Sequence, residues 1–192
     1  PDNGYRSRYS HSTEKATPGY YEVQLDDYGV KAQLTATQRV GVHKYTFPTS
    51  QEGRIILDLN HGIYNYDGKT LWATLRVEND TLLTGYRITN GWARTNYTYF
   101  AISLSQPIKK YGYKDHQRIP YNGWWRKFPV NNNFPEMAGR KLVSYFEFDT
   151  EKNPELVVKV ALSATSTEAA LKNLQAEAAS KSFAEVVREA TE

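Results

Sequence analysis

The chain has 192 residues, which favours one domain, or a domain with an appendage, and is long enough for a sizeable core. Its 24 basic and 21 acidic residues leave a net charge of only +3 with no basic stripe, so nucleic-acid binding is not expected. The absence of cysteine excludes disulfide bonds, thiol catalysis and cysteine-ligated zinc, and no apolar run reaches the roughly 18 residues of a membrane-spanning helix.

The first informative stretch is SHSTEKATPGYYEVQL, residues 10–25. His11 and Glu14 stand in a polar segment before the turn residues Pro18-Gly19, and an alternating strand pattern follows. Positions three apart do not share a face in an extended chain, but a turn would bring the two side chains together. They are either loop residues with local hydrogen bonds or one wall of a site at the end of a sheet. A glycosidase needs two carboxylates across the scissile bond, and Glu14 alone cannot supply that pair.

Strand patterns dominate from residue 20 to residue 163. Apolar and polar residues alternate with a period of two, which is typical of antiparallel strands with one buried face. Short turn signals such as Asn90-Gly91 separate the strands, so the sequence predicts an all-β fold with a large antiparallel β-sandwich. The residues predicted to face inward are Tyr21, Val23, Leu25, Val30, Ala32, Leu34, Ala36, Ile55, Leu57, Leu59, Leu71, Ala73, Leu75, Val77, Phe100, Ile102, Leu104, Leu142, Phe146, Phe148, Leu156, Val158, Val160 and Leu162.

Two segments break this rhythm. In RVGVHKYTF, residues 39–47, the apolar phase shifts, which indicates either a bulge near His43 or burial on both faces. His43 itself, among apolar neighbours, is interpreted as a satisfied core histidine. Residues 105–139, with four prolines and the pair Trp124-Trp125, are predicted to form mainly a long excursion, with room for a short edge strand.

The last part of the chain changes to a helical pattern. Thr165 to Glu168 and Ser182 to Glu185 each fit a capping box at a helix start. The first helix carries a narrow apolar stripe, and helices of this length are marginal on their own. We therefore expect 164–192 to be a linker toward a second domain, with packing on the sandwich itself as the alternative. The stripe consists of Ala170, Leu171, Leu174 and Ala178.

Few other residues suggest chemistry. Trp92 follows Asn90-Gly91 at a hairpin tip, where it would stack on a sugar or dock a domain if exposed and staple the hairpin if buried. Asp58 and His61 end a strand beside turn residues and are interpreted as structural. The four histidines, at 11, 43, 61 and 116, lack the spacing of metal ligands.

The long block YSHSTEKATPGYYEVQLDDYGVKAQLTATQRVGVHKYTFP closely resembles the amino-terminal domain of bacterial α-mannosidases of glycoside hydrolase family 92. RIILDLNHG, GYRITNGWA and YFAISLSQP continue the resemblance in the family's order, and VKVALSATSTEAALKNLQAE resembles the family's exit from sandwich to linker. The resemblance therefore covers nearly the whole chain.

The resemblance implies a supersandwich-like β-sandwich over residues 1–163, lacking its first strands, and a helical linker over 164–192 leading to an absent (α/α)₆ barrel. It implies an exo-acting, inverting, calcium-dependent α-mannosidase of the α-1,2 type that acts on mannose-containing glycans. The catalytic acid, the base and the calcium ligands are expected in the barrel, so none is expected on this chain. It also implies a bacterial protein located outside the cell or in the periplasm.

On this interpretation the chain braces the catalytic barrel. His11, Glu14 and Trp92 are then candidates for the substrate rim or for contacts between domains. The abrupt start at Pro1, with neither an initiator methionine nor a signal peptide, predicts a piece of a longer protein. The alternative hypothesis is a non-catalytic β-sandwich module that binds carbohydrate or mediates domain contacts.

Overall fold

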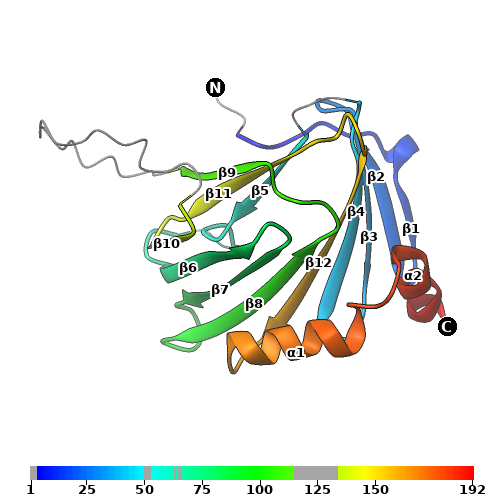
Figure 1. Ribbon diagram of the computed structural model, residues 1–192. Helices are drawn as coiled ribbons and strands as arrows, with labels where there is room; N and C mark the ends of the chain where they lie inside the picture. The colour runs from blue at the N-terminus through cyan, green and yellow to red at the C-terminus, as the bar shows by residue number, and fades with distance from the viewer. Residues whose placement is uncertain (1–3, 50–52, 63, 65, 115–133) are drawn as a thin grey trace, which may run out of the picture.

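The computed structural model describes residues 4–49, 53–62, 64, 66–114 and 134–192 (Figure 1). Within these ranges twelve strands form two antiparallel sheets, and two α-helices follow them. The larger sheet has the order β1 (Lys15–Thr17), β2 (Tyr20–Leu25), β3 (Val30–Ala36), β4 (Val40–Thr46), β12 (Glu155–Ser163), β8 (Asn96–Leu104), β7 (Leu82–Thr89), β6 (Thr70–Asn79) and β10 (Glu136–Gly139). The smaller sheet has the order β5 (Gly53–Asp58), β11 (Val143–Phe148) and β9 (Lys110–Lys114).

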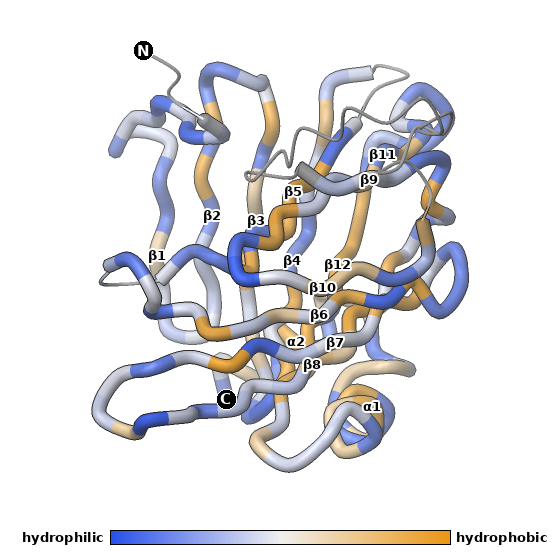
Figure 2. Tube along the Cα trace, turned by 90° about the vertical axis from the view of Figure 1, so that its left-hand side faces the viewer, coloured by the Kyte–Doolittle hydropathy of each residue, from blue (hydrophilic) through white to orange (hydrophobic). Residues whose placement is uncertain are grey.

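The central strands of the nine-stranded sheet are covered on both faces. The three-stranded sheet packs on its inner face, where one apolar cluster joins residues of both sheets, among them Leu75, Phe100 and Phe146. The helices α1 (Thr167–Glu177) and α2 (Phe183–Thr191) pack on its outer face (Figure 1). Apolar stretches run along the strands while the connecting turns are mostly hydrophilic (Figure 2). The predicted all-β sandwich followed by helices is thus confirmed.

Strand β4 shows how two-sided burial appears in a sequence. Val40 and Val42 face outward and pack with the helices, whereas Tyr45 and Phe47 face the inner core. The pairing of β4 with β3 and with β12 runs without a register shift. The phase shift therefore reflects burial on both faces, and the alternative of a bulge near His43 is wrong.

Strand alternation places most of the predicted inward residues correctly. On β8, Phe100, Ile102 and Leu104 lie in the inner core, and Ala101 between them faces the helices. Two predictions fail: Leu162 is 46% exposed and Ala36 is also exposed. Both residues lie at or near the ends of their strands. On β12 the inner cluster ends at Val160.

Residues 105–139 contain more regular structure than predicted. Strand β9 forms an edge of the small sheet beside β11, and strand β10 pairs with β6 at one edge of the large sheet. The short edge strand that the sequence allowed is thus present, and a second one accompanies it, because both pair with strands that lie far away in the sequence. Trp124, Trp125 and His116 lie outside the described residues.

The two helices have their partner surface within this chain. An outer cluster combines residues of β4, β8 and β12 with residues of both helices: Val40, Val42, Ala101, Ala161, Ala170, Leu174, Ala178 and Val186. The alternative of packing on the sandwich itself is therefore correct for both helices. A further role of residues 164–192 as a connection to a second domain stays a prediction.

The helix starts follow their caps closely. Ser166 caps α1 by accepting a hydrogen bond from the backbone N–H of Ala169. The capping box predicted for Thr165 and Glu168 is therefore wrong, because the cap lies one residue later and alanine stands where the box needs glutamate. At α2 the predicted capping box is confirmed, because Ser182 and Glu185 bond each other's backbone N–H groups.

Two polar contacts clamp the segment between the helices to the sheet. Lys159, on the outer face of β12, donates from Nζ to the carbonyl oxygens of Ala178 (2.7 Å), Ala179 (3.2 Å) and Lys181 (2.7 Å). Burial lowers the pKa of the Lys159 ammonium from its ordinary value. Glu177, at the end of α1, accepts a hydrogen bond from the backbone N–H of Arg39 (2.9 Å) and pairs with its guanidinium. The helical segment is therefore an integral part of the sandwich.

Replacing Lys159 by methionine should destabilise the chain by about 1–2 kcal/mol, because the carbonyl groups at the end of α1 lose their donor. Urea unfolding of the 192-residue chain measures this loss. The control is Lys152→Met, which removes an exposed ion pair with Asp149 and should cost no more than about 0.5 kcal/mol. Equal losses for the two variants would contradict the clamp.

Candidate functional site

His11 and Glu14 are brought together by one turn of 3₁₀-helix, His11–Thr13. Ser10 starts this turn, and its side chain accepts a hydrogen bond from the backbone N–H of Ser12. Side chains three residues apart eclipse in a 3₁₀ turn, and His11 Nδ1 lies 2.6 Å from Glu14 Oε2. The expectation that a turn would join the two side chains is confirmed.

Glu14 has a second partner on the neighbouring strand. Its other oxygen, Oε1, accepts a hydrogen bond of 2.6 Å from the Tyr21 hydroxyl. The bonds from Tyr21 and then from His11 lower the pKa of Glu14, and the carboxylate raises the pKa of Tyr21 to about 12. Because the folded-state pKa of Glu14 is depressed, its bonds stabilise the fold above the ordinary carboxyl pKa. That contribution disappears as the pH falls through the depressed value.

The cluster of Tyr21, Glu14 and His11 is open on one side only. The His11 side chain is 85% exposed, whereas that of Glu14 is 25% exposed. Tyr9 packs edge-on against the His11 ring at a centroid distance of 5.6 Å. The arrangement can therefore present an oriented imidazole to a ligand, with the carboxylate behind it.

Trp92 lies far from this cluster. Its residue exposure of 110% excludes the interpretation of a tryptophan that staples the hairpin from inside. Tyr21 lies in one row of paired residues that crosses the sheet and ends at Leu104, the last residue of β8. The residues between them in this row are Leu34, His43 and Val158. Trp92 lies in the turn before β8, at the opposite end of that strand, and the eight residue steps from Leu104 to Asn96 already correspond to about 26 Å. The structure does not bring Trp92 into one site with His11 and Glu14.

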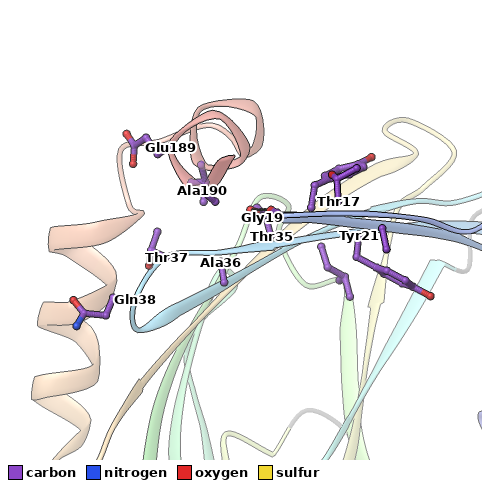
Figure 3. A pocket seen from close by; sticks show the side chains of 13 residues that line it. Thr17, Gly19, Tyr21, Thr35, Ala36, Thr37, Gln38, Glu189 and Ala190 are labelled. Carbon is purple, nitrogen blue, oxygen red and sulfur yellow. Dashed lines mark hydrogen bonds between the residues drawn. The ribbon is translucent and has the colours of Figure 1, made fainter. Parts of the chain in front are cut away.

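A shallow groove of about 720 Å³ lies where β2 and β3 meet α2 (Figure 3). Tyr21 is among the lining residues, but its ring points away from α2 toward the opposite face of the sheet (Figure 3), and its hydroxyl bonds Glu14 there. Gly19, with a φ of +73°, allows the close approach of α2, because a Cβ there would lie 2.5 Å from the carbonyl oxygen of Ala190. Among the described residues that line the groove, Glu189 is the one carboxylate, and Lys181 pairs with it at 2.6 Å.

A second carboxylate, Glu22, stands next to the groove on the outer face. It accepts a hydrogen bond from the Tyr20 hydroxyl and pairs with Lys31 at 3.0 Å. These two partners, Tyr20 first, lower the pKa of Glu22. Glu14 and Glu22 each have close partners of their own, and the alternation of strand side chains sends Tyr21, which holds Glu14, and Glu22 to opposite faces. They do not form an opposed catalytic pair.

The remaining candidates are structural. His43 Nδ1 lies 3.0 Å from the Tyr45 hydroxyl, and burial lowers the pKa of this imidazole, as expected of a satisfied core histidine. Asp58 Oδ1 accepts hydrogen bonds from the backbone N–H groups of Asn60 and His61. This is an Asx turn, so the structural interpretation of Asp58 and His61 is confirmed.

Over the part of the chain that the structure describes, no group of three or more His, Asp or Glu side chains is placed to hold a metal ion. The acidic and histidine side chains of these described residues are therefore not grouped as a calcium site would need. Over the same residues, no helix is long and apolar enough to cross a membrane.

The family is decided by a match that spans most of the chain. Residues 1–163 match the model of the glycosyl hydrolase family 92 N-terminal domain. The chain belongs to glycoside hydrolase family 92. This confirms the resemblance noted from the sequence.

Solved structures of family 92 proteins share this fold. The α-mannosidase BT3965 from Bacteroides thetaiotaomicron is 36% identical with a TM-score of 0.84, and the match covers 100% of this chain and 25% of that one. The inverting mannosidase BT2199 from Bacteroides thetaiotaomicron VPI-5482 is 24% identical, with a TM-score of 0.77 over 96% of this chain and 22% of that one. The chain thus spans about a quarter of the family 92 enzymes that it matches.

Solved structures that share less of the sequence show only that the fold is similar. A bacterial glucoamylase complexed with acarbose matches over 93% of this chain and 27% of that one, at 14% identity and a TM-score of 0.55. No curated protein sequence matches the chain.

Sequence reasoning missed the part that Tyr21 plays in this family 92 domain. It was predicted only as an inward strand residue, yet its hydroxyl also holds Glu14. A tyrosine at the start of the strand after Pro18-Gly19 could have suggested the contact, because the turn folds the strand back beside Glu14.

Replacing Glu14 by glutamine should move the pKa of Tyr21 from about 12 toward 10, because the hydrogen bond to the Glu14 carboxylate is the largest cause of the rise and the carboxylate charge adds to it. An NMR titration of the tyrosine ring carbons measures this pKa. The matched control is Glu22→Gln, which removes the neighbouring carboxylate and should leave the pKa of Tyr21 high. An unchanged Tyr21 titration in Glu14→Gln would refute the described contact.

Proposed function

We propose that this chain is the amino-terminal β-sandwich of an exo-acting, inverting, calcium-dependent α-mannosidase of the α-1,2 type that hydrolyses mannose-containing glycans. The observation that carries the proposal is the 36% identity over the whole chain to a family 92 α-mannosidase. A second structure of BT3965, in complex with mannoimidazole, matches at 35% identity and adds support for a mannose-like substrate.

The proposed role of this chain is to brace the catalytic domain. An inverting glycosidase holds its acid and base roughly 6.5–9.5 Å apart with a water between them, and that spacing needs a rigid scaffold. The clamps at Lys159 and Glu177 fix the helical segment on the sheet, which supports the idea of a stiff connection. The acid and the base are proposed to lie in a helical barrel outside this chain.

Calcium is proposed to bind in the same outside part. Calcium prefers six to eight oxygen ligands, several of them carboxylates. The carboxylates beside the groove, Glu22 and Glu189, already have close partners, and so has Glu14 in its own cluster. When bound, the ion would supply positive charge to polarise sugar oxygens. The expected location outside the cell or in the periplasm stays a prediction.

The cluster at the edge of the sheet is proposed to form part of the pocket rim or of the contact with the catalytic domain. His11 would bond a sugar hydroxyl or a partner residue through its exposed ring nitrogen. Glu14 would fix the orientation of the ring from behind, and Tyr21 would hold the carboxylate in place. These are binding and positioning roles.

The proposal is tested by assaying mannobiosides of each linkage with the longer polypeptide and with the 192-residue chain alone. We expect the longer protein to release mannose from the α-1,2 substrate, to lose activity on chelation and to regain it with calcium. The 192-residue chain should release none. Activity of the short chain alone, or indifference of the longer protein to chelation, would overturn the corresponding part of the proposal.

His11→Ala and Glu14→Ala in the longer polypeptide should each reduce kcat/KM about fivefold or more, which corresponds to about 1 kcal/mol for one hydrogen bond. Steady-state kinetics on the cleaved mannobioside measure the change. Asp27→Ala, which removes an exposed ion pair with Arg8, is the control and should leave kcat/KM unchanged. If the kinetics of both variants equal those of the wild type, neither residue belongs to the rim.

A further inference from the structure

Aromatic side chains gather on the half of the outer face that the helices leave open. Helix α2 packs on β2, β3 and β4, and α1 packs mainly on β12 and β8. Beyond them, toward β6 and the end of the β7–β8 hairpin, strands carry large rings on the same side of the sheet as the helices.

The strand register aligns these rings in two rows. One row runs from Trp72 on β6 through Ile88 to Tyr97 on β8, and the next row pairs Tyr86 with Tyr99. Neighbouring residues of a strand point to opposite faces of the sheet. Ala73, next to Trp72, and Phe100, next to Tyr99, both lie in the inner core, so the two rows lie on the outer face. We call Trp72, Tyr86, Tyr97, Tyr99 and Trp92 the aromatic surface.

The tyrosines of the aromatic surface contact one another. Tyr97 stacks on Tyr99 at a centroid distance of 5.9 Å, and Tyr86 lies 5.6 Å from Tyr99. Nevertheless, Trp72 and Tyr97 are 41% and 43% exposed, and Trp92 at the adjoining hairpin end is fully exposed. Contiguous exposed apolar area of this kind marks an interaction site, and tryptophan and tyrosine are the side chains that most often anchor one.

The position of the aromatic surface indicates what covers it. The chain spans about a quarter of the family 92 enzymes that it matches, so about three quarters of those proteins lie outside it. In this chain the polypeptide crosses from β12 to α1 at the sheet end where β8 begins, since Ser163 pairs with Tyr99. The helices already occupy the adjoining half of the outer face, and the aromatic surface continues that covered area.

We propose that the aromatic surface is the docking site for the catalytic part of the same polypeptide, with Trp92 and Trp72 as its anchors. This inference rests on the proposed function only in assuming that such a part is present. It assigns Trp92 to contact between domains and not to the substrate rim. Arg76, which pairs with Glu78 and Glu136 in the next row, would border the interface with an ion-pair network.

Hydrogen exchange tests the docking directly. Backbone amides of residues 90–97 should exchange about tenfold more slowly, or slower still, in the longer polypeptide than in the 192-residue chain. Trp92→Ala and Trp72→Ala in the longer polypeptide should each restore much of the fast exchange. The control is Tyr28→Ala, which removes a 47% exposed ring at the β2–β3 turn and should change nothing at residues 90–97.

Three outcomes would overturn the proposal. The first is equal exchange at residues 90–97 in the two proteins. The second is slowing of that exchange in the 192-residue chain on addition of α-1,2-mannobiose, which would indicate a glycan site. The third is a dimer of the 192-residue chain that Trp92→Ala dissociates. Because exchange is read without turnover, its result is distinguishable from failure of the mannosidase activity.

Discussion

Burial of both faces of the nine-stranded sheet is the constraint on which the structure depends. Each central strand sends alternate side chains into two separate apolar clusters, one shared with the small sheet and one shared with the helices. Removing either cover would expose a continuous apolar face, which a sheet in water does not tolerate. The helices are therefore as much a part of this fold as the second sheet, although the family model ends at residue 163.

On the outer face of the sheet, the size of the side chains changes from the strands that the helices cover to the strands that they leave open. Near β4 and β12 it carries small side chains such as Ala101, Ala161 and Val42, which allow the helices to approach closely. At the end of α1, Lys159 and Glu177 replace apolar contacts with hydrogen bonds to carbonyl groups and to the β3–β4 hairpin. On β6, β7 and the first part of β8 the outer side chains are large and aromatic, and no helix of the described chain packs mainly on these strands. Small residues mark the face that this chain covers itself, and large rings mark the face that it leaves open.

The edge of the sheet near β1 combines local and tertiary chemistry. One 3₁₀ turn sets His11 against Glu14, and strand pairing then places Tyr21 within reach of the same carboxylate. The carboxylate is ionised and fully engaged, while the imidazole stays exposed. Such an arrangement suits binding and orientation. The acid and base of a family 92 reaction would have to come from elsewhere.

The sequence by itself determined the all-β class, the inward residues of most strands, the helix starts and the family, because period-two alternation and capping are local and the family block is long. It also indicated that His11 and Glu14 could meet through a turn. Only the tertiary structure decided that Val40 and Val42 face helices more than 100 residues away. It also decided that Tyr21 holds Glu14, that β9 and β10 pair with distant strands, and that Trp92 stands apart. Those outcomes depend on which strands become neighbours, and a one-dimensional pattern records the period of a strand but not the identity of its partner.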